Sequence, residues 1–244
     1  MKLLLEISYV GTAYHGYQVQ PGLMTVQGRL QEALEDFYGA PLMLTGCSRT
    51  DAGVHARQFF LTVEGDMYEG MPPEKLPAAI ASRLPYDISV NSARVVDDNF
   101  HARYDVKYKE YEYLIWNAPI MDPFLYGRAF HRPRPLDAQV MNRAAGEFVG
   151  KHDFAAFMAQ GGSAKSSVRE IKYFTCEREG DLIRIRVAAD GFLYNMVRIL
   201  SGTLVNISEG KITEPVADIT ASLDRARAGE TLPPDGLYLN KVVY

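Results

Sequence analysis

Apolar and polar positions alternate along the first hundred residues with two different periods. Stretches of period two predict strands, and stretches with apolar residues three or four positions apart predict helices. Thr25 is of a residue type that caps helices, and Gly39 is placed to end the helix that follows it. The predicted order is β-α-β-β-α-β, the split motif of an antiparallel α+β sandwich: strand 3–9, helix 26–38, strand 42–47, strand 58–63, helix 74–83 and strand 88–96.

The second half of the chain repeats this alternation with longer insertions. Its predicted elements are strand 108–116, helix 136–149, a hairpin of strands 173–177 and 182–188 that turns near Gly180, and helix 192–207. We therefore expect an α+β protein of two halves, 1–104 and 105–244, with no low-complexity linker between them. Two packed sheets would leave a cleft at their junction, where a large ligand could lie.

The composition is that of an ordinary globular chain. The 244 residues are 47% hydrophobic and 23% charged, enough to build a large core, and no apolar run is long enough to cross a membrane. The two cysteines, Cys47 and Cys176, have no metal-ligand spacing and favour a reducing compartment. We expect a cytoplasmic protein that holds no metal.

The net charge of −4, taken alone, argues against a nucleic-acid-binding protein, because phosphate contacts need lysine and arginine. The charge is unevenly distributed, however. Residues 60–100 carry 3 basic and 7 acidic side chains, whereas residues 101–172 carry 11 basic and 8 acidic ones. The basic middle of the chain could line one groove, and the alternative is an ordinary solvated face of mixed charge.

The segment 47–56, Cys-Ser-Arg-Thr-Asp-Ala-Gly-Val-His-Ala, is the most informative part of the chain. It places Arg49 and Asp51 two positions apart, at a turn after a predicted strand. A carboxylate held beside a guanidinium stays ionised near neutral pH and can act as a nucleophile. The alternative is local, with Asp51 capping a turn in which Gly53 takes a positive φ.

Arg198 lies in a segment, 192–200, whose apolar residues would cover most of a helix surface. A buried arginine without an anion is very costly. The acidic residues nearest in sequence, Asp190 and Glu209, are eight and eleven positions away. Arg198 is therefore a candidate partner for Asp51 from the other half of the chain, and the alternative is a structural arginine bonded to carbonyl groups.

Tyr111 and Tyr113 fall on one face of the predicted strand 108–116. A tyrosine on a sheet that faces a cleft is a platform on which a nucleobase can stack. The alternative is that both rings pack in the core. The sequence has no Walker or Rossmann glycine loop and no histidines at metal-ligand spacing, so we expect chemistry without a cofactor.

Together these segments resemble the tRNA pseudouridine synthase A family over nearly the whole chain. Residues 49–56 resemble the family signature, and further motifs match at 9–20 with 25–27, at 100–103 followed by 111–113, at 196–198 with Gly202, and at 236–239. Ser48 and Tyr17 depart from the family pattern, which usually has glycine and often tryptophan at these positions. Neither change removes a reacting group.

The resemblance implies a pseudouridine synthase fold, in which two β-α-β-β-α-β-like halves form one extended mixed sheet around a central cleft. It implies that Asp51 is the catalytic nucleophile and that Tyr111 packs against the target uracil. Arg198 would pair with Asp51, and Arg49 would help to hold the displaced nucleotide. The implied partner is tRNA, bound across a homodimer, and the implied reaction converts uridine to pseudouridine at positions 38, 39 and 40 of the anticodon stem-loop.

Two other classes of function stay open from the residues alone. A non-catalytic RNA-binding protein would keep the same fold and use Asp51 structurally. A small-molecule enzyme built on an aspartate and arginine pair would suit the acidic total charge, although the basic middle segment and the stacking tyrosine speak against it.

Overall fold

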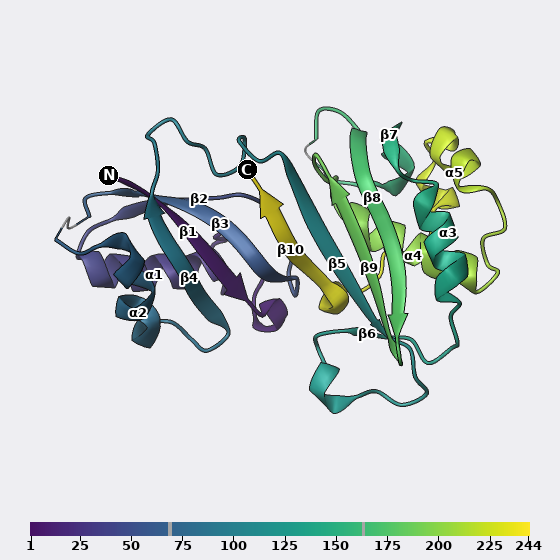
Figure 1. Cartoon of the computed structure of the whole chain (residues 1–244), viewed down its shortest axis with the longest axis horizontal. Helices are drawn as coiled ribbons and strands as arrows, with labels where there is room; N and C mark the ends of the chain where they lie inside the picture. The colour runs from purple at the N-terminus through teal and green to yellow at the C-terminus, as the bar shows by residue number, and fades with distance from the viewer. Residues whose placement is uncertain (68–69, 163) are drawn as a thin grey trace. The chain divides into compact units, whose positions relative to one another are not determined.

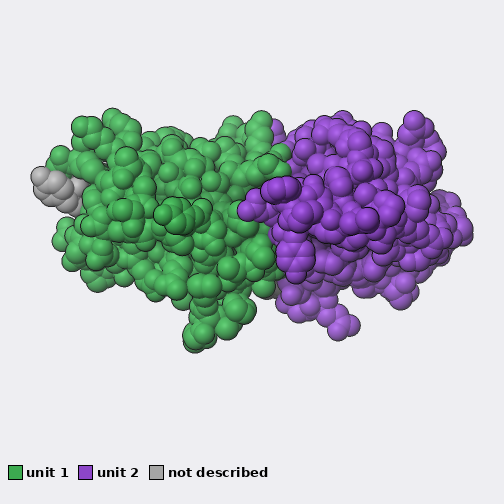
Figure 2. Space-filling view, turned by 90° about the horizontal axis from the view of Figure 1, so that it is seen from below, with its two compact units in different colours: residues 1–107, 238–244 green, residues 108–237 purple. Residues whose placement is uncertain are grey.

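The computed structural model describes residues 1–67, 70–162 and 164–244. The chain forms two compact units (Figure 1, Figure 2). Unit 1 comprises residues 1–107 and 238–244, and unit 2 comprises residues 108–237. The boundary near residue 107 is close to the expected one. Residues 238–244, however, belong with unit 1 and not with the expected half 105–244, because the end of the chain returns to pair with a strand of unit 1.

Unit 1 contains a mixed sheet with two helices packed beside it (Figure 1). Its elements are β1 (Lys2–Tyr9), α1 (Val26–Tyr38), β2 (Leu42–Gly46), β3 (His55–Gly65), α2 (Leu76–Ile80), β4 (Ile88–Val95) and most of β10 (Leu237–Val243), with 3-10 turns at Gly11–Ala13, Pro73–Lys75 and Ala81–Arg83. β1 pairs antiparallel with β4 and β3. On its other edge, β3 pairs antiparallel with β2 and parallel with β10.

The predicted β-α-β-β-α-β order of the first hundred residues is confirmed. α1 begins and ends where its capping residues indicate: Thr25 Oγ1 accepts a hydrogen bond from Gly28 N at 3.2 Å, and Gly39 is left-handed with a φ of 70°. The predicted helix 74–83 is wrong in its extent, because α2 is short and is flanked by 3-10 turns. Pro77 lies in the first turn of α2, where a missing donor is tolerated, but it could not donate the hydrogen bond that an α-helix beginning at residue 74 would require.

Unit 2 also combines strands of mixed pairing with helices. Its elements are β5 (Tyr108–Trp116), β6 (Phe130–His131), α3 (Ala138–Gly146), β7 (Gly150–Asp153), β8 (Val168–Glu179), β9 (Leu182–Ala189), α4 (Met196–Ser208) and α5 (Val216–Ser222), with 3-10 turns at Pro123–Leu125, Ala155–Phe157, Arg225–Arg227 and Pro234–Gly236. The strand order is β5-β9-β8-β7, antiparallel throughout, and β6 pairs in parallel with β5. α3 packs against β8 and α4 (Figure 1).

The predicted hairpin and the predicted strand 108–116 are confirmed, as β8 with β9 and as β5. The predicted helix 192–207 begins too early, because Asn195 takes a left-handed φ of 58° and α4 starts after it. Both units combine helices with a mixed sheet, so the predicted α+β class is confirmed. Across the described part of the chain, no helix is both long enough and apolar enough to span a bilayer.

A buried carboxylate ties the end of α4 to the residues after β6. Arg132 donates two hydrogen bonds to Glu209, each 2.7 Å long, and Lys211 Nζ lies 2.7 Å from the same carboxylate. The Glu209 side chain is fully buried. The hydrogen bonds from Arg132 and Lys211, together with the charges of both cations, lower the pKa of Glu209 to about 2, so the carboxylate is ionised and neutralises Arg132 at neutral pH.

Candidate active site

Asp51 lies in the connection between β2 and β3 of unit 1, on a tight turn. Its carbonyl oxygen accepts a hydrogen bond from Val54 N at 3.1 Å, and Gly53 has a φ of 80°. This is the turn that the local alternative predicts, and it explains the glycine. Asp51 itself is partly exposed.

The N-terminal segment 9–17 holds this turn from several directions. The buried hydroxyls of Tyr9 and Thr50 are 2.8 Å apart and hydrogen bonded. The carbonyl oxygen of Thr50 accepts a hydrogen bond from Tyr17 N at 3.1 Å, and Gly53 N donates to the carbonyl oxygen of Tyr14 at 3.2 Å. The residues on both sides of Asp51 are therefore fixed by bonds from a segment some forty positions earlier.

Two glycines let the N-terminal segment come this close. A Cβ atom on Gly11 would lie 1.9 Å from the carbonyl oxygen of Val54, and one on Gly16 would lie 2.5 Å from that of Thr50. Gly16 also has a φ of 88°, which L-residues with side chains rarely adopt. The buried His55 adds a further bond, since its Nδ1 accepts from Gly11 N at 2.9 Å. The turn that presents Asp51 is thus rigidly positioned.

Arg49, the other residue that the sequence singles out here, has an exposed side chain. Within the described residues it forms no ion pair with Asp51 or with any other carboxylate of unit 1. The expectation that Arg49 keeps Asp51 ionised is therefore not supported, whereas an exposed guanidinium two residues from Asp51 suits a contact with a phosphate.

In unit 2, Tyr111 and Tyr113 share a face of β5 and have different surroundings. Tyr113 is fully buried, and its hydroxyl donates to the carbonyl oxygen of Pro233 at 2.6 Å. This ring is part of the core, as the alternative predicts, and its burial raises the pKa of Tyr113 well above the usual value. Tyr111 is 7% exposed and contacts Phe192 edge to face, with ring centroids 5.0 Å apart. Tyr111 therefore has an apolar wall beside it.

Arg198 lies in the first turn of α4 and is partly buried. Its Nε donates to the carbonyl oxygen of Leu232 at 2.6 Å, and its Nη1 donates to Asn195 Oδ1 at 2.8 Å. These contacts agree with the alternative that Arg198 is a structural arginine bonded to carbonyl groups. They orient the guanidinium within unit 2 without neutralising its charge, so they do not replace an anionic partner. The ion pair with Asp51 stays a prediction.

The predicted site residues thus divide between the units, with Arg49 and Asp51 in unit 1 and Tyr111 and Arg198 in unit 2. Comparison with known proteins shows which family the chain belongs to. A family model described as tRNA pseudouridine synthase matches residues 7–105 and 144–244, most of the chain. The chain belongs to the tRNA pseudouridine synthase family.

Individual relatives in the tRNA pseudouridine synthase family match over almost their whole length. Proteins named tRNA pseudouridine synthase A from Thermoanaerobacter sp. (strain X514) and from Ruminiclostridium cellulolyticum are each 44% identical, over 99% and 100% of this chain and 99% of their own. One from Brevibacillus brevis is 39% identical over 100% of this chain and 99% of its own. The predicted family, and with it the predicted class of enzyme, are confirmed.

The similarity to a solved structure is much weaker than the similarity to these relatives in sequence. A chain in a solved structure named "Crystal Structure of a Cbf5-Nop10-Gar1 Complex" is similar with a TM-score of 0.39 and 13% identity, over 97% of this chain and 48% of that one. A likeness at this level carries no argument about the site.

The position at which this member of the tRNA pseudouridine synthase family has Tyr17 carries a buried hydroxyl without a partner. Tyr17 is 3% exposed, and its ring packs on Phe59 with centroids 4.2 Å apart. Its hydroxyl oxygen makes no hydrogen bond among the described residues. Burial also raises the pKa of this tyrosine far above its usual value, so it stays protonated.

We expect Tyr17→Phe to raise the free energy of unfolding by about 1 kcal/mol, because it removes a desolvated, unpaired hydroxyl and keeps the ring packing. Urea denaturation monitored by circular dichroism measures the change. Tyr9→Phe is the matched control, because it deletes a buried hydroxyl that does have a partner and should destabilise the protein. Equal effects of the two substitutions would contradict this reading.

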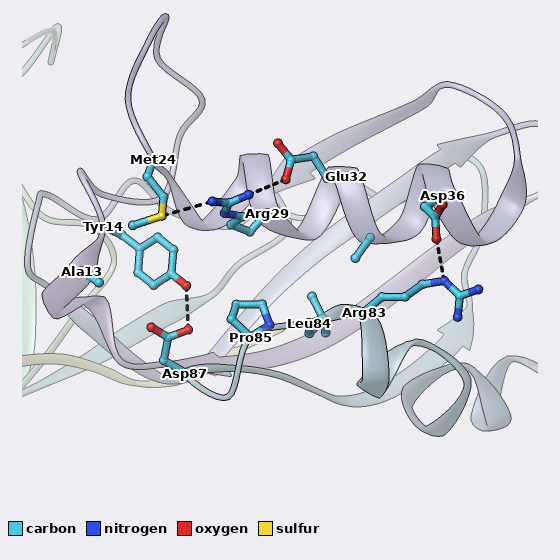
Figure 3. A pocket seen from close by; sticks show the side chains of 11 residues that line it. Ala13, Tyr14, Met24, Arg29, Glu32, Asp36, Arg83, Leu84, Pro85 and Asp87 are labelled. Carbon is cyan, nitrogen blue, oxygen red and sulfur yellow. Dashed lines mark hydrogen bonds and ion pairs between the residues drawn. The ribbon is translucent and has the colours of Figure 1, made fainter.

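An open pocket of about 610 Å³ on unit 1 lies against α1 and the residues before β4, and none of the predicted site residues lines it (Figure 3). Its polar groups already bond to each other, as the dashed lines show: Tyr14 donates to Asp87 at 2.6 Å and Arg83 to Asp36 at 2.8 Å. We therefore do not assign the catalytic site to this pocket. Nor does any group of three or more metal-ligating side chains occur among the described residues.

Sequence reasoning from the residues missed the segment 9–17 as part of the site. It predicts here only the strand 3–9, whereas Gly11, just beyond that strand, closely approaches the turn after Asp51. The available signal was the density of glycine and tyrosine in Tyr-Val-Gly-Thr-Ala-Tyr-His-Gly-Tyr, which a simple strand end does not require.

Proposed function

We propose that the chain converts uridine to pseudouridine at positions 38, 39 and 40 of the tRNA anticodon stem-loop, with Asp51 as the reacting carboxylate. The observation that carries this proposal is the turn at Asp51. Its backbone is fixed by hydrogen bonds from Tyr14 and Tyr17, and by the bond between the hydroxyls of Tyr9 and Thr50. In a member of the tRNA pseudouridine synthase family, a carboxylate presented in this way is the natural group to react.

The reaction is an isomerisation with a balanced exchange of bonds. The bond from N1 to C1′ breaks, the uracil turns, C5 bonds to C1′, and the proton lost from C5 is replaced by one at N1. Asp51 either attacks C1′ and is displaced again, or removes a proton at C2′ and returns it. No step changes the oxidation state or consumes energy, so we invoke neither a cofactor nor a metal.

A base in a stem has to leave its stack before Asp51 can reach the sugar, at a cost of about a few kcal/mol. Tyr111 would offset part of this cost by packing against the uracil, since its ring lies beside Phe192 in an apolar setting. Arg49, which is exposed, would contact the backbone of the displaced nucleotide. Arg198 would pair with Asp51 and favour the ionised form of the carboxylate.

The tRNA would be bound across a homodimer in the cytoplasm. The family membership supports the tRNA, and the predominance of basic residues between 101 and 172 supports an RNA contact near β5. The two buried free cysteines, Cys47 and Cys176, support a reducing compartment.

The test is release of tritium from tRNA labelled at C5 of uridine, with the purified protein alone. Release from tRNA with uridine at 38, 39 or 40, and no release when these uridines are replaced by cytidine, is the expected result. Binding of tRNA without release would instead identify a non-catalytic RNA-binding protein. Release from other positions would overturn the assignment to the anticodon stem-loop.

We expect Tyr111→Phe to lower kcat about tenfold while the KM for tRNA changes less than twofold. The phenyl ring keeps the packing against the base and against Phe192, but the hydroxyl that assists loss of the C5 proton is gone. Single-turnover tritium release measures the effect. Tyr113→Phe serves as the matched control, because that hydroxyl bonds within the core. An unchanged kcat in Tyr111→Phe would show that the hydroxyl takes no part in loss of the C5 proton and that Tyr111 only packs against the uracil.

A further inference from the structure

The segment 117–135, which follows β5 and includes β6, projects from unit 2 as an ordered loop (Figure 1, teal, at the lower edge). The buried Asn117 draws its two ends together, since its Nδ2 donates to the carbonyl oxygens of Arg132 at 2.6 Å and Arg134 at 2.8 Å. Trp116 Nε1 donates to the carbonyl oxygen of Ile120 at 2.8 Å. The base of the loop is therefore fixed to the sheet.

The tip of the 117–135 segment is also built from hydrogen bonds. Asp122 Oδ1 accepts from Phe124 N at 2.9 Å and so starts the 3-10 turn. The carbonyl oxygen of Leu125 then accepts from Arg128 N and Ala129 N, at 2.9 and 3.0 Å. A chain held at both base and tip presents its side chains in a defined arrangement.

This ordered tip holds large apolar side chains in water. Ile120 is 81% exposed, Phe124 86% and Tyr126 81%. These side chains are not packed into the protein, although hydrogen bonds hold the backbone that carries them. Large apolar groups displayed together on an ordered loop are typical of a binding surface.

The charge of the 117–135 segment differs in sign from that of the whole chain. It contains three arginines and one aspartate, against a net charge of −4 for the chain. Glu209 neutralises Arg132, but neither Arg134 nor the neighbouring Arg178 forms an ion pair within the described residues. Arg178 instead donates to Asn117 Oδ1 at 2.6 Å, which places a guanidinium at the base of the loop.

We propose that the 117–135 segment is a second contact surface for the tRNA substrate, at which Phe124 and Tyr126 stack on unpaired bases while Arg134 and Arg178 contact phosphates. The inference rests on the proposed function for the identity of the RNA. Aromatic faces stack on any base, and arginines beside them neutralise the backbone, the combination that binds single-stranded RNA. No group of this segment takes part in the reaction.

A second copy of the chain is the competing occupant of this surface. If the segment lay on the twofold axis of such a contact, it would meet its own copy and bring the arginines of the two copies together. RNA supplies the opposite charge along with the aromatic faces, so the charges favour RNA.

The experiment compares two double variants of the full chain, with fluorescence anisotropy of labelled tRNA for binding and tritium release for turnover. Phe124→Leu with Tyr126→Leu keeps the surface apolar but removes both aromatic faces. We expect it to raise the Kd and the KM for tRNA about tenfold and to leave kcat at saturating tRNA within twofold. Phe124→Tyr with Tyr126→Phe keeps both rings and should retain wild-type binding.

Two further measurements identify the contact as one with RNA. Arg134→Ala should reduce the slope of log K against log salt by about one, as expected for the loss of one phosphate contact. Tyr86→Leu, at another fully exposed tyrosine, is the matched control and should leave Kd unchanged. Sedimentation velocity of the double variant Phe124→Leu with Tyr126→Leu, at the assay concentration, should show the same oligomeric state as the wild type.

Wild-type tRNA binding in the leucine variant would overturn the inference, and so would a loss of binding that accompanies a change in sedimentation. The second result would identify the segment as an interface between copies of the chain. A wild-type protein that binds tRNA and releases no tritium would instead defeat the proposed function. The anisotropy comparison would still decide whether the 117–135 segment binds RNA.

Discussion

Asp51→Asn is expected to abolish pseudouridine formation, lowering single-turnover tritium release by at least about 10³-fold, while the Kd for tRNA stays within a few-fold of wild type. The amide has nearly the shape of the carboxylate but can neither form the bond to C1′ nor remove a proton at C2′. The turn should survive, because the backbone of Asp51 and its neighbours is held by Val54, Tyr14 and Tyr17.

Asp98→Asn is the control for this substitution, as an exposed aspartate of the same unit whose loss should leave turnover unchanged. Circular dichroism and the unfolding midpoint of Asp51→Asn should match those of the wild type. Substantial turnover in a folded Asp51→Asn protein would show that this carboxylate is not the reacting group, and the assignment would have to move to another residue.

Gly11→Ala is expected to have the second largest effect, on both activity and stability. The new Cβ would lie 1.9 Å from the carbonyl oxygen of Val54, so either the turn after Asp51 or the segment 9–17 must move by about 1 Å. A displacement of that size at a catalytic group can cost about 100-fold in kcat. The clash should also lower the free energy of unfolding by about 3 kcal/mol.

Gly146→Ala provides the control, because a Cβ at that helix position would meet nothing within 4 Å. It should be neutral or slightly stabilising. Turnover and urea denaturation, measured on both variants, separate the loss of geometry from the loss of fold. A Gly11→Ala protein with wild-type kcat would mean that the N-terminal segment does not position Asp51.

Much of the fold was predictable because its signals are local. Thr25 and Gly39 mark the ends of α1 by their own hydrogen bonding and φ, and Gly180 marks the turn of the β8 and β9 hairpin in the same way. The predicted helix 74–83 is wrong in its extent because Pro77 cannot donate the hydrogen bond that a helix beginning at residue 74 would need. The late start of α4 depends on the left-handed Asn195, which the apolar pattern around it does not reveal.

The candidate reacting residues could be predicted from the sequence, whereas most of the contacts that hold them in place could not. The turn at Asp51 could be predicted from Gly53, because Arg49 and Asp51 lie within four residues of this glycine. The contact of Gly11 with Val54 joins positions 43 apart, and that of Arg198 with Leu232 joins positions 34 apart, so no local pattern encodes them. For Arg49 the sequence suggests a partner of Asp51, whereas in unit 1 its side chain is exposed.

The return of β10 to unit 1 has a consequence for how unit 1 folds. Tyr238 stacks on His55 with centroids 4.6 Å apart, and the carbonyl oxygen of Val243 accepts from Lys107 N at 2.8 Å. His55, at the start of β3 and next to the turn that carries Asp51, therefore packs against a residue far later in the sequence. Because the entropy of loop closure disfavours such distant contacts, we expect this strand pairing to be a slow step in the folding of unit 1.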